Sequence, residues 1–339
     1  MQPRRCSRHL FHRGATRDLS VSKVVFASHR SASRACQPAK LFSTLSMARA
    51  VCMSMSHSSH PSQPSGSQAA PDVRRDTEHQ RGLHLLDATI ISLKRPSPHT
   101  LRVGMYLGDV GNDPVWDGVN VAFRVYPDPQ WTAISRVYTV RSFAPHTRCA
   151  EFDVVMHGGD SPMMRWAAQA AIGQQVRLTG PRGNIVLPRG EGRPVALFCD
   201  DSGLPALYAI LRRWPAGVQG VGWIASDDVH GIGELPTVPG LQLQRLPAHG
   251  TDLLLQQARQ LQSPARYLIW GAGERDEMRA IRKYFQTELG MDKADVSIAG
   301  YWKRGASNTD IDAERQSAYQ KFCAAGGKLA DWDDLGIAL

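Results

Sequence analysis

The segment Arg136–Arg141 (RVYTVR) combines an arginine, an aromatic ring and a hydroxyl at the spacing of a β-strand. Alternation places Arg136 and Tyr138 on one face of such a strand and Thr139 on the other. A guanidinium binds phosphates, a flat ring lies against a planar heterocycle, and hydroxyl or backbone groups bond to the ring edge. The segment therefore predicts a strand that binds a planar cofactor with a pyrophosphate, although an amphipathic edge strand has the same pattern.

Length and charge limit the class of protein. A chain of 339 residues is long enough for two domains that each bury a core. The net charge of +9 comes from residues 1–71, which hold ten basic residues and one acid, leaving 30 of each from residue 72 onward. We therefore expect no nucleic-acid partner for the folded part, and we disfavour the alternative of nucleic-acid binding through the basic tail.

Residues 1–75 are predicted to be a disordered basic extension, because Ser, Arg, Pro and Gln replace periodic apolar residues there. An organelle transit peptide has a similar composition, but we prefer an extension without function, with Met47, Met53 or Met55 as alternative starts. Six scattered cysteines without ligand spacing argue against iron–sulfur, zinc and haem sites and favour a reducing compartment. With no apolar run of about 18 residues, we expect a cytoplasmic protein that does not enter a membrane.

The first half of the body reads as short strands separated by turns, which is typical of a small antiparallel barrel. The predicted strands are Leu83–Lys94, Leu101–Leu107, Val119–Val125, Arg136–Phe143, Glu151–His157 and Gln175–Thr179. One helix is predicted at Pro162–Ala171, with Ser161 as its N-cap and proline at its first position. A helix N-terminus offers N–H groups to an anion such as a pyrophosphate, although a plain capped helix has the same sequence.

The second half alternates strands with helices, which predicts a doubly wound parallel sheet. Strands are predicted at Val195–Cys199, Gly220–Ala225, Leu241–Leu246, Tyr267–Trp270 and Val296–Ala299, and helices at Leu204–Trp214, Thr251–Leu261, Glu274–Leu289 and Thr309–Ala325. Ligands of such sheets bind at the carboxyl ends of the strands. We therefore expect turns at Asp200–Ala206 and Gly271–Glu274 to admit a nucleotide, although either has the composition of a simple connection.

This order of barrel and parallel sheet, with an R-x-Y-T strand, resembles the ferredoxin–NADP reductase superfamily. The closer resemblance, across residues 82–305, is to the siderophore-interacting proteins, which are FAD-dependent ferric-siderophore reductases. The matching motifs are TLRV at 100–103, RVYTVR at 136–141, HGGDSPMMRWA at 157–167, GPRG at 180–183, DDSGLPA at 200–206, WGAGE at 270–274 and GYWKRG at 300–305. The domains implied are an FAD-binding barrel at 82–190, an NAD(P)H-binding domain at 194–305 and a C-terminal helical extension at 306–339.

The resemblance also implies site residues. It places Arg136 on the FAD pyrophosphate, Tyr138 against the isoalloxazine and Thr139 near the ring edge. The other cofactor-binding residues that it implies are His157, Gly158, Ser161, Met163, Trp166, Asp201, Ser202, Gly273 and Trp302. Arg182, Lys303 and Arg304 are implied near the flavin edge as a basic patch for an anionic siderophore, unless they are solvated surface charges.

The chemistry requires a flavin between donor and acceptor, because nicotinamide gives two electrons as hydride and Fe(III) takes one. We therefore predict an oxidoreductase that passes electrons from NADPH or NADH through FAD to a ferric siderophore and acts as a monomer. The acid run Ser226–Asp228 suits the ribose diol of NADH, but surface acids are common, so the donor stays open. The rival interpretations are a flavin or ferredoxin reductase on the same fold, and a siderophore-binding protein without turnover.

Overall fold

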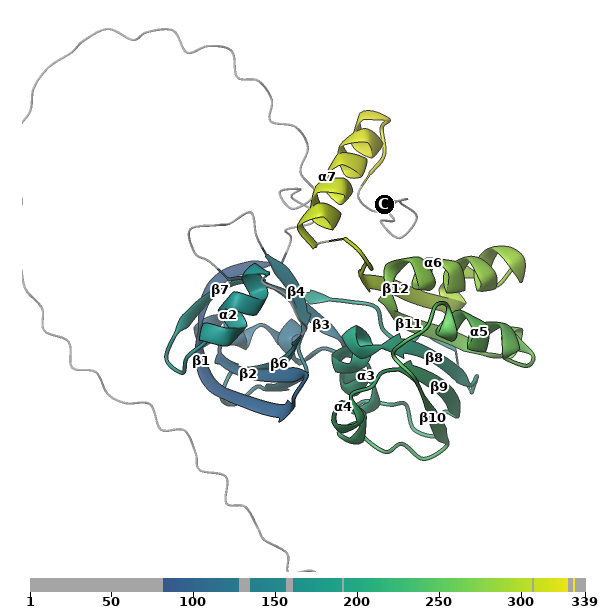
Figure 1. Cartoon of the computed structure of the whole chain (residues 1–339), viewed down its shortest axis with the longest axis horizontal. Coiled ribbons are helices and arrows are strands. Elements are labelled where there is room, and N and C mark those ends of the chain that lie inside the picture. The colour runs from purple at the N-terminus through teal and green to yellow at the C-terminus, as the bar shows by residue number, and fades with distance from the viewer. Residues whose placement is uncertain are drawn as a thin grey trace, which may run out of the picture. The chain divides into compact units, whose positions relative to one another are not determined.

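The structure is a computed structural model that describes residues 82–127, 135–156, 161–190, 192–306, 308–328 and 332. All of these residues belong to one compact unit of the chain. Among them, no helix is both long and apolar enough to cross a membrane. Two sheets organise the described residues, one antiparallel and one parallel (Figure 1).

The first sheet is antiparallel and has the strand order β4-β3-β7-β1-β2-β6-β5. Its strands are β1 (His84–Ser97), β2 (Thr100–Tyr106), β3 (Val121–Tyr126), β4 (Arg136–Thr139), β5 (Ser142–Ala144), β6 (Cys149–Val155) and β7 (Gln175–Gly183). The two residues after β4 bond to strands that lie near opposite ends of this order. Val140 donates its N–H to Val121 of β3 (2.7 Å) and Arg141 donates to Glu151 of β6 (2.8 Å). These bonds curl the sheet into a barrel, so the predicted barrel is confirmed.

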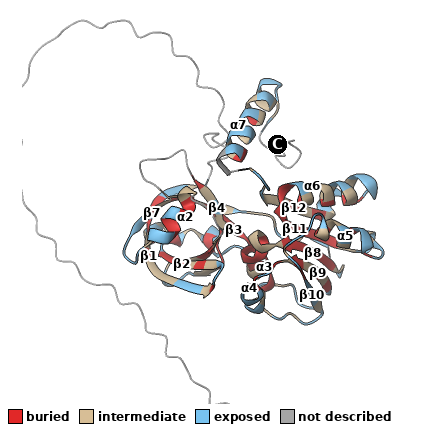
Figure 2. Ribbon diagram, viewed as in Figure 1, coloured by how far each residue is buried: buried red, intermediate tan, exposed pale blue. Residues whose placement is uncertain are grey.

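The same switch of partners explains one wrong boundary. A single strand was predicted at Arg136–Phe143, but β4 ends at Thr139 and β5 begins at Ser142. The barrel interior is filled by alternate side chains of its strands and by the inner face of α2 (Pro162–Gln169), shown in red in Figure 2. Short helical turns η2 (Gly108–Asn112) and η3 (Pro114–Asp117) close one end, where Trp116 is fully buried.

The second sheet is parallel, with the order β10-β9-β8-β11-β12. Its strands are β8 (Val195–Asp200), β9 (Gly220–Ala225), β10 (Leu241–Leu246), β11 (Leu268–Glu274) and β12 (Val296–Trp302). The helices are α3 (Leu204–Leu211), α4 (Val229–Gly233), α5 (Leu253–Gln260) and α6 (Arg275–Lys283). Side chains of α3 form one apolar cluster on the sheet, and those of α5 and α6 form another. Helices therefore cover both faces, and the predicted doubly wound sheet is confirmed.

The turn predicted at Gly271–Glu274 is wrong, because these residues complete β11. All four are buried, and β11 pairs with β8 on one side and β12 on the other. Glycine fits there because neighbours come close: a Cβ on Gly273 would lie 2.9 Å from the Asp200 carboxyl group. Helix α4 was not predicted from the sequence, because it is only five residues long and contains two glycines.

The remaining elements are short turns and a C-terminal helix. They are η4 (Asp201–Gly203), η5 (Pro264–Arg266), the π-helical turn η6 (Tyr284–Glu288), η7 (Lys293–Asp295) and α7 (Asn308–Ala324). The helix predicted at the C-terminus corresponds to α7.

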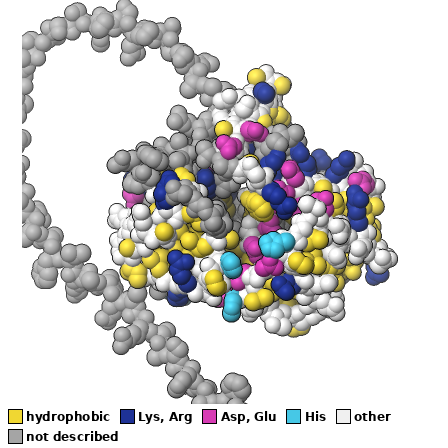
Figure 3. Space-filling model, viewed as in Figure 1, with side chains coloured by type: hydrophobic (Ala, Val, Ile, Leu, Met, Phe, Trp, Pro, Cys, Tyr) yellow, Lys and Arg dark blue, Asp and Glu magenta, His cyan; other side chains and the backbone are white. Residues whose placement is uncertain are grey.

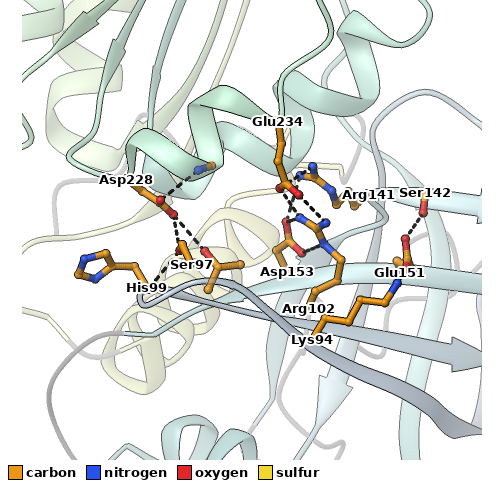
Figure 4. Close-up of polar contacts among 12 residues, drawn as sticks. Lys94, Ser97, His99, Arg102, Arg141, Ser142, Glu151, Asp153, Asp228 and Glu234 are labelled. Atoms are coloured by element: carbon orange, nitrogen blue, oxygen red, sulfur yellow. Dashed lines mark hydrogen bonds and ion pairs between the residues drawn. The ribbon is translucent and has the colours of Figure 1, made fainter. Parts of the chain in front are cut away.

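Ion pairs join the barrel to α4 of the parallel sheet (Figure 4). Glu234, directly after α4, accepts hydrogen bonds from Arg102 (2.7 and 3.0 Å) and Arg141 (3.0 Å) of the barrel. Asp153 of β6 bonds to the same two arginines. Although burial opposes its charge, the hydrogen bonds to Glu234 and Asp153 raise the pKa of Arg102. The network therefore fixes α4 against the barrel through charges that compensate one another.

The Glu234→Gln variant should lose about 1 kcal/mol of unfolding free energy near neutral pH, because its partners keep only a neutral acceptor. The hydrogen bond from Arg102 lowers the pKa of Glu234 below its ordinary value of 4.5. This contribution is therefore complete above that value and is lost as the pH falls through the lowered pKa. Denaturant unfolding measured from about pH 7 to about pH 3 should show wild type and variant converging in acid.

A matched control for this prediction is Glu288→Gln, which removes a carboxylate that lies 4.0 Å from Arg259 at the surface. We expect it to change stability by less than about 0.5 kcal/mol at any pH. A gap between wild type and Glu234→Gln that stays constant down to low pH would contradict the assigned role of the charge.

Candidate functional site

Three arginines lie on neighbouring strands of the barrel. Arg124 is on β3, Arg136 on the adjacent β4 and Arg182 on β7, which pairs with the other side of β3. Arg124 donates to the Ser135 hydroxyl (2.8 Å) and Arg136 to the Ser135 carbonyl (2.8 Å). Burial, and also the charge of Arg124, lower the pKa of Arg136 and of Arg182. Cations that disfavour one another in a partly buried place are typical of a site for an anion.

We call the group of Arg124, Arg136 and Arg182 the arginine face, and a carboxylate of the C-terminal helix already lies beside its first two members. Asp312 of α7 is 3.6 Å from Arg124, and its charge acts against the pKa lowering of Arg136. Arg124 was not among the predicted site residues, since an arginine in a strand has no signal that separates it from surface charge. Its place beside Arg136 becomes visible only when β3 and β4 pair.

The predicted ring and hydroxyl of β4 point to different neighbours. Tyr138 packs on Phe152 (ring centroids 5.0 Å apart) and Phe123 (6.5 Å), and burial raises the pKa of its hydroxyl. Thr139 is buried and bonds to the hydroxyl of Tyr301 in β12. Burial raises the pKa of Tyr301 to about 12. Thr139 therefore also links the barrel to the last strand of the parallel sheet.

At the end of β8, Asp200 accepts hydrogen bonds from three separate segments. Its Oδ1 accepts from the Ser202 N–H (2.8 Å) and hydroxyl (2.5 Å), and its Oδ2 accepts from the Glu274 N–H (2.8 Å) and the Trp302 indole (2.7 Å). Burial raises the pKa of Asp200, while these four donors oppose the shift. The strand order reverses between β8 and β11, and this is the switch point at which such sheets bind ligands. We call this group of contacts the Asp200 bracket.

The Asp200 bracket unites three predicted site residues. Ser202 and Trp302 are its donors, and Gly273 allows the backbone of β11 to approach the carboxylate. Asp200 itself was not predicted as a site residue, although it begins the DDSGLPA motif. The apolar pattern of the strand before them does not reveal which of the two consecutive acids, Asp200 or Asp201, points inward.

A cavity of about 500 Å³ opens beside the bracket, between the carboxyl ends of β8, β9 and β10 and the barrel. Asp201 lines it, bonds to Ser226, and has an Oδ1 with no hydrogen-bond partner in the described part of the chain. Burial, and then the nearby carboxylates of Asp200 and Asp228, raise the pKa of Asp201. Figure 3 shows acidic and histidine side chains gathered near the middle of this face. The cavity offers acceptors to a ligand rich in hydroxyl or amide donors.

The predicted basic patch is divided between the two sheets. Arg182 belongs to the arginine face of the barrel, whereas Lys303 and Arg304 follow β12. Lys303 pairs with Asp276 (3.6 Å), and the Arg304 N–H bonds to Glu274 (3.0 Å). Lys303 and Arg304 line a hollow of about 110 Å³ together with acidic residues of α7.

The helix predicted to meet a phosphate begins as expected, with Ser161 accepting from the Met164 N–H (3.3 Å). Met163 and Trp166 turn their side chains into the barrel core, so they offer a ligand only their backbone. His157 and Gly158 lie outside the described residues. The roles of these residues stay predictions. Within the described chain, no group of His, Cys, Asp or Glu is placed to hold a metal ion.

An antiparallel barrel with an arginine face, followed by a parallel sheet with a polar bracket at its switch point, is the arrangement of a two-domain flavin-dependent reductase. Comparison with known proteins gives the particular family. Residues 193–305 match the siderophore-interacting protein family and residues 114–185 match the siderophore-interacting FAD-binding domain. The chain belongs to the siderophore-interacting proteins, and its barrel is of their FAD-binding type.

Individual relatives agree with this assignment. The chain is 34% identical to the ferric acinetobactin reductase of Acinetobacter baumannii over 79% of this chain and 95% of that one. It is 30% identical to an NADPH-dependent ferric-chelate reductase of Escherichia coli over 40% of this chain and 54% of that one. Among solved structures, a siderophore-interacting protein from Acinetobacter baumannii is similar with a TM-score of 0.68 and 33% identity, over 71% of this chain and 99% of that one.

Proposed function

We propose that this protein is an FAD-dependent oxidoreductase that passes electrons from NAD(P)H to the ferric ion of a siderophore. The single observation that carries the proposal is the Asp200 bracket at the switch point, next to a barrel whose strands carry the arginine face. A donor site at the sheet edge and an anion site on the barrel are the two binding sites that this reaction needs. The names of the relatives support the same acceptor.

The residues of the arginine face fit a flavin dinucleotide. Arg136 and Arg124 present guanidinium groups that a pyrophosphate would neutralise, which relieves their mutual repulsion. Tyr138 offers an aromatic surface, held in place by Phe123 and Phe152. Bound FAD supplies the conversion between a two-electron donor and a one-electron acceptor.

The chain's own groups orient the two substrates. The Asp200 bracket fixes Ser202 and the indole of Trp302 at the sheet edge, where a nicotinamide nucleotide enters. Lys303 and Arg304 attract an acceptor that carries negative charge, such as a catecholate or carboxylate chelate. Reduction to Fe(II) weakens the hold of hard oxygen ligands on the iron, and the metal is then released. We further propose that the protein works in the cytoplasm, as a monomer, and without a nucleic-acid partner.

The test is an anaerobic absorbance spectrum of the purified protein, recorded before and after addition of NADH or NADPH and again after a ferric siderophore with a ferrous trap. We expect a flavin spectrum that bleaches with the donor and returns as Fe(II) appears. A colourless protein that FAD does not reconstitute would instead support a binding protein without turnover. A protein whose bound flavin passes electrons to free flavin or ferredoxin, but not to the ferric chelate, would support the rival interpretation of a flavin or ferredoxin reductase.

Changing Lys303 and Arg304 together to alanine should raise KM for an anionic ferric siderophore by roughly tenfold, since two attractive charges are lost. Reduction of a neutral acceptor such as a quinone should keep its rate. Steady-state kinetics with both acceptors measures the difference. The matched control is Lys283→Ala with Lys293→Ala, two exposed lysines elsewhere in the same half of the chain. Equal losses with both acceptors would indicate a structural role for Lys303 and Arg304.

A further inference from the structure

The cavity beside the Asp200 bracket is negatively charged. Its lining at the edge of the parallel sheet includes Asp201, Asp227 and Asp228. Two more acids line it, Asp153 from β6 of the barrel and Glu234 from the end of α4. Among the described lining residues, Arg141 is the sole lysine or arginine, and it is bonded to Asp153 and Glu234. A ligand that enters this cavity therefore meets more carboxylates than cations.

Asp227 is the carboxylate that stays accessible. Asp228 is buried, caps α4 through the Gly231 N–H (3.0 Å) and accepts from Ser97 (2.8 Å) and Thr100 (3.2 Å) of the barrel. Glu234 is held by the arginines of the barrel. The Asp227 side chain is 47% exposed and stands two positions after the end of β9, the second strand of the parallel sheet.

Asp227 also lies beside two basic side chains. Its carboxylate lies 3.8 Å from the Arg245 guanidinium and 3.4 Å from the His249 ring. Its Oδ1 accepts a hydrogen bond from the Ala248 N–H (3.2 Å), which fixes the start of the loop after β10. The two basic side chains that stand close enough to meet a phosphate are thus already paired with an acid.

We propose that the electron donor is NADH and that Asp227 selects it against NADPH; this rests on the proposed function, because it names the donor of the same reaction. A carboxylate after the second strand of a nucleotide-binding sheet accepts hydrogen bonds from the 2′- and 3′-hydroxyls of the adenosine ribose. A 2′-phosphate at that place brings about two negative charges to Asp227, with Asp201 and Asp228 on the same cavity wall.

The Asp227→Asn variant separates this role from a structural one. Asparagine keeps the Oδ1 that the Ala248 N–H needs, so the loop retains its hydrogen bond. It removes the charge that repels a 2′-phosphate and leaves Arg245 and His249 to attract one. NADPH use should therefore improve while NADH use declines, whereas damage to the fold would lower both.

The experiment uses the FAD-loaded full-length enzyme. Stopped-flow reduction of the flavin gives the rate constants with NADH and NADPH, and calorimetry gives the dissociation constants of NAD⁺ and NADP⁺ without turnover. Wild type should favour the NAD form by about tenfold or more in both measurements. In Asp227→Asn that ratio should fall by about tenfold, with tighter NADP⁺ binding. Glu288→Gln, which removes an exposed carboxylate paired with Arg259, should keep the wild-type ratio.

Each contrary outcome has a distinct meaning. Wild type that prefers NADPH would overturn the selection of NADH and leave the reductase function standing. An unchanged ratio in Asp227→Asn, with both nucleotides weakened alike, would overturn the assignment of selection to Asp227. Flavin that neither nucleotide reduces or binds would overturn the donor site itself, and the proposed function with it.

Discussion

Replacing Arg136 with alanine should yield protein that loses most of its FAD during purification. Arg136 lies on β4, where burial and the charge of nearby Arg124 lower its pKa, on the part of the barrel that we assign to the pyrophosphate. Hydrogen bonds to charged groups contribute about 1.5–3 kcal/mol, so FAD affinity should fall by roughly 10- to 150-fold. The ratio of flavin to protein absorbance, and FAD titration of the apoprotein, measure the loss.

Arg177→Ala is the matched control for this loss. Arg177 is also an arginine of the barrel, on β7, but it pairs with Asp87 at the surface (2.9 Å) and lies outside the arginine face. We expect it to retain FAD at the wild-type level. If Arg136→Ala also retained its full flavin content, the assignment of Arg136 to the pyrophosphate would be wrong.

The Asp200→Ala variant should lose about 3–5 kcal/mol of unfolding free energy. Its proposed binding site for the nicotinamide nucleotide should be disrupted as well. The change removes the shared acceptor of the partly exposed Trp302 indole and of a part-buried hydroxyl and two part-buried backbone N–H groups, and donors left without partners away from water are costly. Denaturant unfolding measures the loss. Flavin reduction by NAD(P)H should be much slower even where the variant is fully folded, because Ser202 and Trp302 lose their fixed positions.

Two further variants grade this effect. Ser202→Ala removes one of the four donors and should cost about 1 kcal/mol. Asp109→Ala removes a carboxylate that is 98% exposed and pairs with Arg148 at the surface, so it should cost less than about 0.5 kcal/mol. An Asp200→Ala protein as stable as Asp109→Ala would contradict the role of the bracket.

Sequence patterns predicted both sheets well, because the pattern of apolar and polar residues within a strand follows which of its side chains are buried. That pattern can be read from the strand alone. Boundaries failed where a segment changed partners, as at Val140 and Arg141. The turn expected at Gly271–Glu274 failed because glycine was taken as a turn signal, whereas here it makes room for Asp200. A glycine in a turn and a glycine in a strand look the same in the sequence. Only the neighbouring strand in the folded sheet shows which of the two roles applies.

Site residues were predictable to the extent that a motif carried them. Arg136, Ser202 and Trp302 stand in motifs, and the structure places the last two on one carboxylate. Arg124 and Asp200 were missed because their roles depend on pairing between segments that the sequence does not align. The ion pairs of Glu234 with the barrel were missed for the same reason, since residue 234 and Arg102 are 132 positions apart.

The Asp200 bracket also sets when the site can exist during synthesis. Asp200 and Trp302 are 102 positions apart, and a nascent chain emerges from its N-terminus onward. The barrel strands and β8 are therefore made well before the indole that completes the bracket. A chain that terminates between residues 183 and 302 contains every barrel strand but lacks the indole that completes the donor site. Translation to the end of β12 is thus a condition for electron flow, which spares the cell a half-made flavoprotein that consumes reduced nicotinamide.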